Sequence, residues 1–316
     1  MTRKRGKRRA KQAERRRTQS IEGGLRVPTL FEIGEFEVTS FGLMLLLAFI
    51  SSAWILSLQL RRRGLDPQIA WDVLAWTAVG GIVGAKLYYL ALHWHEVAAD
   101  PAMIFGRGGL VWYGGLIGGV LAFYWQVRRR GLPLGASFDS AAPALAVGYA
   151  FGRMGCFLVG DDYGLPTDSA LGMVFPETAA VPSTAGYLRT VGADIAAAVP
   201  DSALLAVHPT QLYEIAAALV MFAVLWRAST WALRPGRLFG LFLALYGIER
   251  FLIEFVRAKD DRFVLGLTTS QAMSLLLLGA AVYLWTRHGT EARPAAAAGG
   301  TLAAEAEAAD PRGGGV

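Results

Sequence analysis

The sequence predicts an all-α integral membrane protein with seven transmembrane helices. Hydrophobic residues make up 54% of its 316 residues, and the mean hydropathy of +0.38 is high for a soluble domain. Stretches of about twenty apolar residues, enough to cross a bilayer as a helix, recur along the chain. We therefore expect a seven-helix membrane domain over residues 28–288, with spans at 38–59, 70–92, 109–127, 137–158, 209–227, 237–257 and 267–286.

Two terminal segments flank this predicted domain. Residues 1–17 hold ten Lys or Arg and one Glu, so the net charge of +6 comes from a basic tail. No apolar segment follows that tail directly, which argues against a secretory signal. We expect residues 1–27 to be a disordered arm that contacts membrane lipids, with no nucleic-acid partner. Residues 289–316 are rich in Ala, Gly and Glu, and we expect them to be disordered as well.

Basic residues in the short loops predict the orientation. The loops after the first, third and fifth spans hold nine arginines, against five basic residues in the opposite loops. Because the more basic side faces the cytoplasm, the N-terminus is expected outside and the C-terminus inside. Residues 159–208 then form an extracytoplasmic loop. The nine arginines are Arg61, Arg62, Arg63, Arg128, Arg129, Arg130, Arg227, Arg234 and Arg237.

In this orientation, polar residues from four spans reach the same outer end of the membrane. Each charge at mid-membrane depth costs on the order of 2.5–3.5 kcal/mol, so such residues by default mark a site. Spacings of three and four place several of them on shared helix faces. The set comprises Tyr113, Arg153, Asp161, His208, Gln211, Glu214, Arg250, Glu254 and Arg257.

The arginines of this set predict the chemistry of its ligand. A guanidinium group binds phosphate with two parallel hydrogen bonds and stays charged, so an outer-leaflet pocket of arginines predicts an anionic phospholipid. Two other interpretations stay open. Arg250 and Glu254 could be a structural pair while Arg153 extends to the interface, or the charges could line the path of a transporter. The skew of the charges to one face and the lack of an internal repeat count against a transporter.

Cysteine and histidine usage bounds the metal chemistry. Cys156 is the one cysteine, which excludes an internal disulfide framework and a multi-cysteine zinc site. His93 and His95 alternate, but no third ligand follows at helical spacing. We therefore expect no metal and no cofactor.

Five motifs follow one another between about residue 28 and residue 286. In order they are "TSFGLMLLLAF", "GGLVWYGGLIGG", "GRMGCFLVGDDYG", "HPTQLYE" and "RFLIEFVR". Together they resemble the bacterial prolipoprotein diacylglyceryl transferases, whose patterns include G-R-x-G-N-F-x-N-x-E-x-x-G, H-P-[ST]-Q-L-Y-E and R-F-x-x-E-F-x-R. The resemblance implies a multi-pass enzyme of the bacterial cytoplasmic (inner) membrane.

The resemblance also implies a reaction. Phosphatidylglycerol gives its diacylglyceryl group to the lipobox cysteine of a prolipoprotein signal peptide, a thioether forms, and glycerol phosphate leaves. By this resemblance Arg153 grips the headgroup, and Arg250 stabilises the departing phosphate, which Glu254 and Arg257 orient. Asp161, which stands where the family has Glu, is a further implied substrate-binding residue. The remaining implied binding residues are Gly164, His208, Gln211 and Glu214.

Several positions depart from the family's pattern. The family often has His, a candidate base, where this chain has Tyr113, and a free tyrosine with a pKa of about 10 is a poor base near neutral pH. Tyr113 could therefore act as the catalytic base only if a nearby arginine lowered its pKa. Otherwise it would position the thiol while another group or the headgroup phosphate takes the proton. Phe41 replaces a family Tyr, while Cys156 and Val159 each replace an Asn. These changes leave a catalytically degenerate paralogue, or a lipid-binding membrane protein, as the alternative.

Overall fold

The computed structural model describes residues 29–33, 36–105, 109–259, 262–264 and 266–287. The two predicted tails, 1–27 and 289–316, lie outside the described residues. The chain divides into two compact units, and each is described by itself. The first unit contains the described residues up to Ser52 together with Pro143–Trp226 and Phe242–Gly279, and the second contains Ala53–Ala142, Arg227–Leu241 and the described residues from Ala280.

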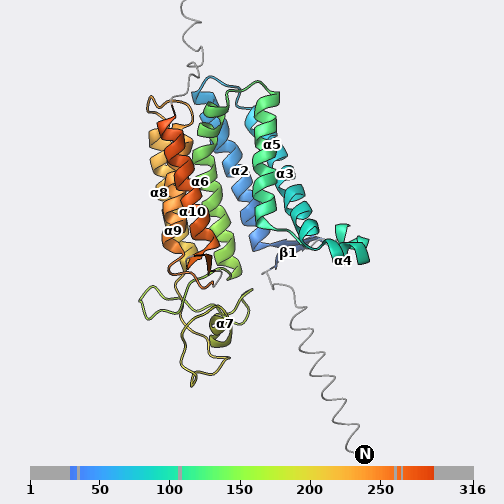
Figure 1. Cartoon of the computed structure of the whole chain (residues 1–316), viewed down its shortest axis with the longest axis vertical. Coiled ribbons are helices and arrows are strands. Elements are labelled where there is room, and N and C mark those ends of the chain that lie inside the picture. Colours follow the sequence, from blue (N-terminus) through green and yellow to red (C-terminus); the bar gives the residue numbers. More distant parts are fainter. Residues whose placement is uncertain (1–28, 34–35, 106–108, 260–261, 265, 288–316) are drawn as a thin grey trace, which may run out of the picture. The chain divides into compact units, whose positions relative to one another are not determined.

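A helix occupies each of the seven predicted stretches within the described part of the chain (Figure 1). Four of these described helices, α2, α3, α6 and α8, are long and apolar enough to cross a membrane. Large apolar side chains such as Leu46 and Val220 lie exposed on them, as lipid-facing surfaces require. The prediction of an integral membrane protein is thereby supported, whereas seven spans stay a prediction. The helices are α2 (Ser40–Arg62), α3 (Ile69–Leu92), α5 (Trp112–Arg129), α6 (Leu134–Val159), α8 (Thr210–Ala228), α9 (Arg237–Ile253) and α10 (Thr269–Thr286).

The described chain is mainly helical, as predicted, but it also contains short strands. Two antiparallel two-stranded hairpins are present, which apolar periodicity did not reveal because their strands are short. The first pairs β1 (Thr29–Ile33) with β2 (Phe36–Thr39), immediately before α2. The second pairs β3 (Arg262–Val264) with β4 (Leu267–Thr268), immediately before α10.

The first unit also contains the connection between α6 and α8, residues 160–209, which we call the cap. Figure 1 shows the cap beyond the ends of these two helices. It has a small core in which Tyr163, Phe175, Leu188 and Val207 are buried together, and a short helix α7 (Ala185–Thr190). The extracytoplasmic loop expected at 159–208 stays a prediction, and the core and helix of the cap were not predicted from the sequence.

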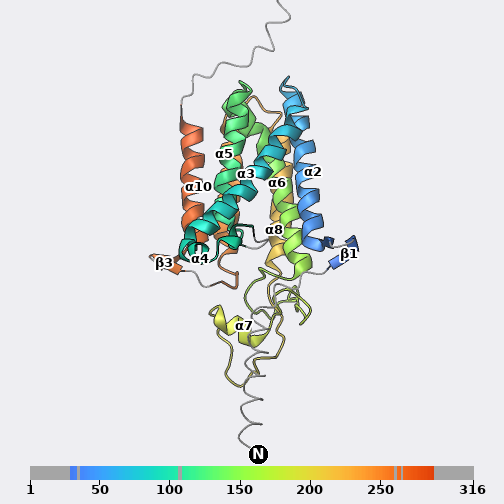
Figure 2. The same cartoon turned by 90° about the vertical axis from the view of Figure 1, so that its right-hand side faces the viewer.

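The second unit contains a close contact between α3 and α5, which cross each other in Figures 1 and 2. Glycines line this contact, which we call the glycine seam. A Cβ atom at Gly118 would lie 2.2 Å from the Gly80 carbonyl oxygen, and one at Gly84 would lie 2.4 Å from the Gly114 carbonyl oxygen. Only residues without a side chain allow this approach, which is how small residues pack membrane helices.

An arginine-rich turn ends α2 in the second unit. Gly64 follows Arg61, Arg62 and Arg63, and its φ of +71° lies in the left-handed region that glycine adopts freely. The Leu65 N–H donates to the Leu60 carbonyl at 3.0 Å, which satisfies an end carbonyl of α2. The arginine-rich loop after α2 is therefore a well-defined helix end.

Candidate functional site

Glu214, in the second turn of α8, joins two arginines from neighbouring helices. Its Oε1 atom lies 2.8 Å from Arg153 Nη2 of α6 and 2.6 Å from Arg250 Nη1 of α9. The Glu214 side chain is fully buried. Since a buried carboxylate is costly without partners, these two guanidinium groups are what allow its charge at this depth.

Three further residues close the contacts into a ring. Arg153 Nη1 lies 2.6 Å from Asp162 Oδ2, and the other oxygen of Asp162 pairs with Arg257 Nη2. Glu254 Oε2 lies 3.4 Å from Arg257 Nη1 and 3.5 Å from Arg250 Nη2. Charges of opposite sign thus alternate around a closed cycle, which we call the ion-pair ring. Its members are Glu214, Arg153, Asp162, Arg257, Glu254 and Arg250.

Asp162 is the most exposed member of the ion-pair ring, with 36% of its side chain accessible. Burial raises the pKa of this carboxyl, but Arg257 and Arg153 lower it by more, so the pKa lies well below its usual range. The residue has a φ of +61°, in the left-handed region that Asp tolerates better than most residues. The turn that contains Asp162 follows α6 directly, and it places the Asp162 side chain against both arginines.

Asp161 does not take part in the ring. Its backbone carbonyl accepts a hydrogen bond from Gln211 Nε2 at 2.6 Å. Its pKa is raised, first by burial and then by the adjacent Asp162. The substrate-binding role implied for Asp161 stays a prediction, whereas the carboxylate that the structure brings to the arginines is Asp162. Sequence reasoning missed it, although two consecutive acidic residues after a predicted span were the available signal.

Two of the predicted helix faces do not form as expected. His208 precedes α8, so it does not share a helical face with Gln211 and Glu214, and its Nδ1 atom lies 3.4 Å from the Tyr213 hydroxyl. α9 ends at Ile253 rather than at residue 257. Helical periodicity was extrapolated past the points where tertiary contacts bend the chain.

Arg257 reaches the ring through a backbone contact instead of a helix face. It forms an isolated antiparallel bridge with Gly164 of the cap. A Cβ atom at Gly164 would lie 2.4 Å from the Val256 carbonyl oxygen, so this close approach requires glycine. The structure thereby gives Gly164 a packing reason to be glycine, while its predicted contact with lipid stays a prediction.

The family departures lie in different places. Tyr113 is in the first turn of α5 in the second unit, and its predicted catalytic role stays a prediction. Phe41 packs at Gly155, where a Cβ atom would lie 3.0 Å from its ring. Cys156 Sγ lies 3.7 Å from Arg153 Nη1.

In the part of the chain that the structure describes, no group of three metal-binding side chains occurs.

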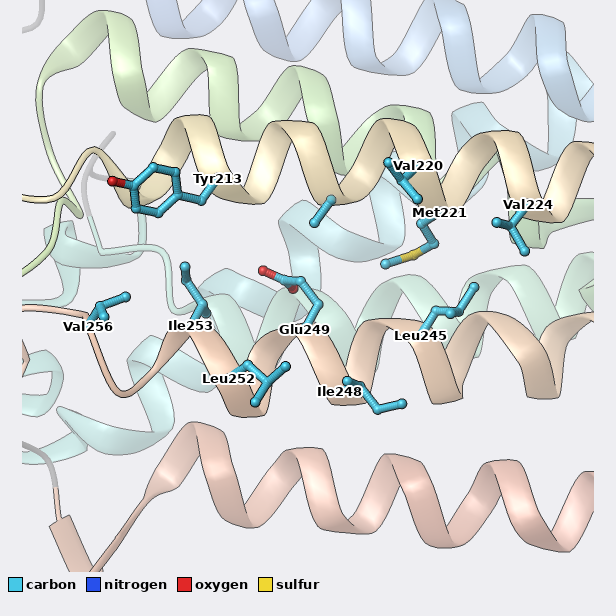
Figure 3. Close-up of a pocket in the computed structure, with 11 residues that line it drawn as sticks. Tyr213, Val220, Met221, Val224, Leu245, Ile248, Glu249, Leu252, Ile253 and Val256 are labelled. Atoms are coloured by element: carbon cyan, nitrogen blue, oxygen red, sulfur yellow. The ribbon is translucent and has the colours of Figure 1, made fainter. Parts of the chain in front are cut away.

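Tyr149 and Glu249 adjoin the ring, and sequence reasoning missed both. The Tyr149 hydroxyl lies 3.0 Å from Glu214 Oε1 and 3.2 Å from Glu249 Oε2. Glu249 lines a groove of about 420 Å³ between α8 and α9, whose other lining residues are mostly apolar (Figure 3). As an acidic residue next to Arg250 inside a predicted span, Glu249 carried the same signal as the residues that were chosen.

Comparison with known proteins identifies the family. The family model described as prolipoprotein diacylglyceryl transferase matches residues 28–287. The chain belongs to this family. The resemblance of the five motifs is thereby confirmed, and the match covers everything between the two tails.

Several curated relatives carry the name phosphatidylglycerol–prolipoprotein diacylglyceryl transferase. One from Xylella fastidiosa (strain 9a5c) is 34% identical over 275 residues, which cover 82% of this chain and 91% of the relative. One from Clostridium tetani is 29% identical and covers 82% of this chain and 96% of its own length. One from Xanthomonas oryzae pv. oryzae (strain PXO99A) is 37% identical, covering 74% of this chain and 80% of the relative.

Proposed function

We propose that the chain transfers the diacylglyceryl group of phosphatidylglycerol to the lipobox cysteine thiol of prolipoprotein signal peptides. A thioether forms and glycerol phosphate is released. The observation that carries this proposal is the ion-pair ring, in which three guanidinium groups converge within a chain of this family. Guanidinium groups can exchange a carboxylate partner for a phosphate, because both anions present the same pair of acceptor oxygens.

In this proposal, different residues of the ion-pair ring act in lipid binding and in catalysis. Arg153 holds the phosphate of the bound lipid, and Asp162, the most exposed partner of Arg153, is the carboxylate that the phosphate displaces. Arg250 stabilises the charge that develops on the departing glycerol phosphate. Glu254 and Arg257 orient Arg250 through their chain of ion pairs.

The remaining assigned residues support this arrangement. Gln211 fixes the turn after α6 through its bond to the Asp161 carbonyl. Gly164 allows the approach of Arg257, and His208 begins the segment that leads into α8. Tyr113 positions the incoming thiol.

The membrane arrangement is part of the same proposal. Seven helices span the bacterial cytoplasmic membrane, with the N-terminus outside, the C-terminus inside and the cap on the outer side. The nine loop arginines support this orientation, because the more basic loops face the cytoplasm. Reporter fusions after Arg62 and within the cap test this, and a fusion at Arg62 that reports an outside location would contradict it.

The experiment that tests the function is mass spectrometry of a lipobox peptide incubated with the purified protein and phosphatidylglycerol vesicles. We expect a diacylglyceryl mass gain on the peptide cysteine, none on a peptide with Ser at that position, and none with Arg153→Ala. Arg61→Ala is the matched control, because Arg61 is exposed in the second unit, and it should keep activity.

The negative outcomes separate the alternatives. If the wild-type protein binds the lipid without a mass gain, the chain is a catalytically degenerate paralogue. If it neither transfers nor binds the lipid, a transport function replaces the proposal.

A further inference from the structure

The Tyr149 hydroxyl lies between two carboxyl groups. It is 3.0 Å from Glu214 Oε1 and 3.2 and 3.3 Å from the two oxygens of Glu249. A phenol has one hydrogen and therefore makes one donated hydrogen bond. Both contacts are hydrogen bonds only if one of the two carboxyl groups carries a proton and donates it to the phenol oxygen.

The surroundings indicate which carboxyl group holds that proton. Glu214 Oε1 already accepts a hydrogen bond from Arg250 and forms an ion pair with Arg153, and both contacts stabilise its charged form. Within the ion-pair ring, three guanidinium groups already match three carboxylates. Glu249 is an additional carboxyl group, and it has no ion-pair partner among the described residues. The extra proton therefore belongs to Glu249, and Tyr149 donates its own hydrogen to Glu214.

The groove between α8 and α9 favours the same assignment. Figure 3 shows the Glu249 carboxyl in the space between the two helices, among apolar side chains such as Met221 and Leu252. A charge facing such a surface is costly, whereas a neutral carboxyl group is not. The titratable and charged groups that face Glu249 are Tyr149 and Arg153 of α6, Glu214 of α8, and Tyr246 and Arg250 of α9.

We propose that Glu249 is the proton relay of the transfer reaction, an inference that rests on the proposed function. One oxygen of its carboxyl group accepts the proton of the lipobox thiol while the other gives its proton to the departing phosphate oxygen. The S–H and C–O bonds break, and the S–C and O–H bonds form. The thioether and glycerol phosphate monoanion result, Glu249 returns to its starting state, and no net charge appears in the apolar groove.

The relay is tested by comparing Glu249→Gln with the wild-type protein in single-turnover transfer to a lipobox peptide. An amide keeps the shape of the side chain but cannot carry the proton. We therefore expect the transfer rate near pH 7 to fall by a factor of at least about 100. Binding of phosphatidylglycerol vesicles should change by less than about threefold, because the ring is intact. Glu177→Gln, which changes an exposed carboxylate of the cap, is the matched control and should behave as wild type.

The pH profile distinguishes a relay from a structural role. Without the relay, transfer needs thiolate from solution, whose fraction rises about tenfold per pH unit below the thiol pKa of about 8.5. The ratio of wild-type to Glu249→Gln rates should therefore fall by at least about that factor per unit between about pH 6 and pH 8. Glu249→Asp keeps a carboxyl group and should keep the pH dependence of the wild type, which provides the same test if the Gln variant does not fold.

Two results would overturn the relay. One is a Glu249→Gln rate within about threefold of wild type near pH 7, and the other is a rate ratio that does not change with pH. A Glu249→Asp profile as steep as that expected for the Gln variant would count equally against it. Failure of the proposed function would give a different result, because the wild-type protein would then show no transfer at any pH.

Discussion

The ion-pair ring of the first unit and the glycine seam of the second bring helices together by opposite means. In the ring, long charged side chains from α6, α8 and α9 meet, and each buried charge is balanced by its neighbours. In the seam, the absence of side chains lets the backbones of α3 and α5 approach each other. Loss of a buried charge should therefore destabilise the ring, and an added side-chain atom should destabilise the seam.

This difference also separates function from scaffold. A guanidinium group can exchange its carboxylate for another anion, so the ring can accept a ligand without unfolding. The seam consists of backbone atoms already in contact and has no group to exchange. We therefore expect substitutions in the ring to change both activity and stability, and substitutions in the seam to change stability first.

The largest effect is expected for Arg250→Ala in the ring. It removes a partner from Glu214 and Glu254, both buried, which should cost about 3–5 kcal/mol of unfolding free energy. Transfer should fall by at least about 100-fold, because the departing phosphate loses its stabilising charge. Unfolding in detergent micelles and initial rates measure the two effects. Arg250→Lys keeps the charge and should retain part of the stability, and equal stability of the Ala variant and the wild type would show that the ring is not a balanced unit.

The next effect is expected for Gly118→Ala in the seam. Its Cβ atom would lie 2.2 Å from the Gly80 carbonyl oxygen, so the helices must separate, at a cost of about 1–3 kcal/mol. The control is Gly279→Ala in α10, where a Cβ atom meets nothing within 4 Å and the better helix propensity of Ala should stabilise slightly. If the two variants unfold at the same temperature, the seam is not close-packed.

A smaller effect is expected for Asp139→Ala. Asp139 lies in the second unit and is not a member of the ion-pair ring. Asp139 accepts hydrogen bonds from the Gly236 N–H at 2.9 Å and the Phe239 N–H at 2.8 Å, at the start of α9. Its removal should cost about 1–2 kcal/mol, and Asp139→Asn, which keeps one acceptor oxygen, should cost less. The melting temperatures of the two variants measure this difference. A lower melting temperature for Asp139→Asn than for Asp139→Ala would contradict the role of Asp139 as a cap of α9.

The smallest effect concerns the acid stability that Asp162 contributes. Because the pKa of its carboxyl is lowered in the folded protein, its contribution is present above the unfolded pKa of about 3.9 and is lost as the pH falls toward the folded value. The melting temperature should therefore decline below about pH 4, and Asp162→Asn should flatten this part of the profile. The effect is limited because the side chain is 36% exposed. If the melting temperature of Asp162→Asn declines below about pH 4 as much as that of the wild type, other carboxylates cause the decline.

Much of the fold was predictable because hydropathy is a local property. Each predicted apolar stretch contains a helix, since a run of about twenty apolar residues has few other ways to satisfy its backbone in lipid. The ends were less predictable. α9 stops at Ile253 because Arg257 pairs with Gly164 of the cap, and a partner so distant in sequence leaves no local signal.

By itself, the sequence determined that arginines and carboxylates from several helices would gather, because charges inside apolar stretches are rare and have to find one another. It also determined the family, through five motifs in order. Only the tertiary structure decided that Asp162 rather than Asp161 meets Arg153, and that Tyr149 and Glu249 adjoin the ring. The physical reason is that hydropathy and periodicity act along one segment, whereas the choice of partner depends on which side chains of α6, α8 and α9 arrive at the same place.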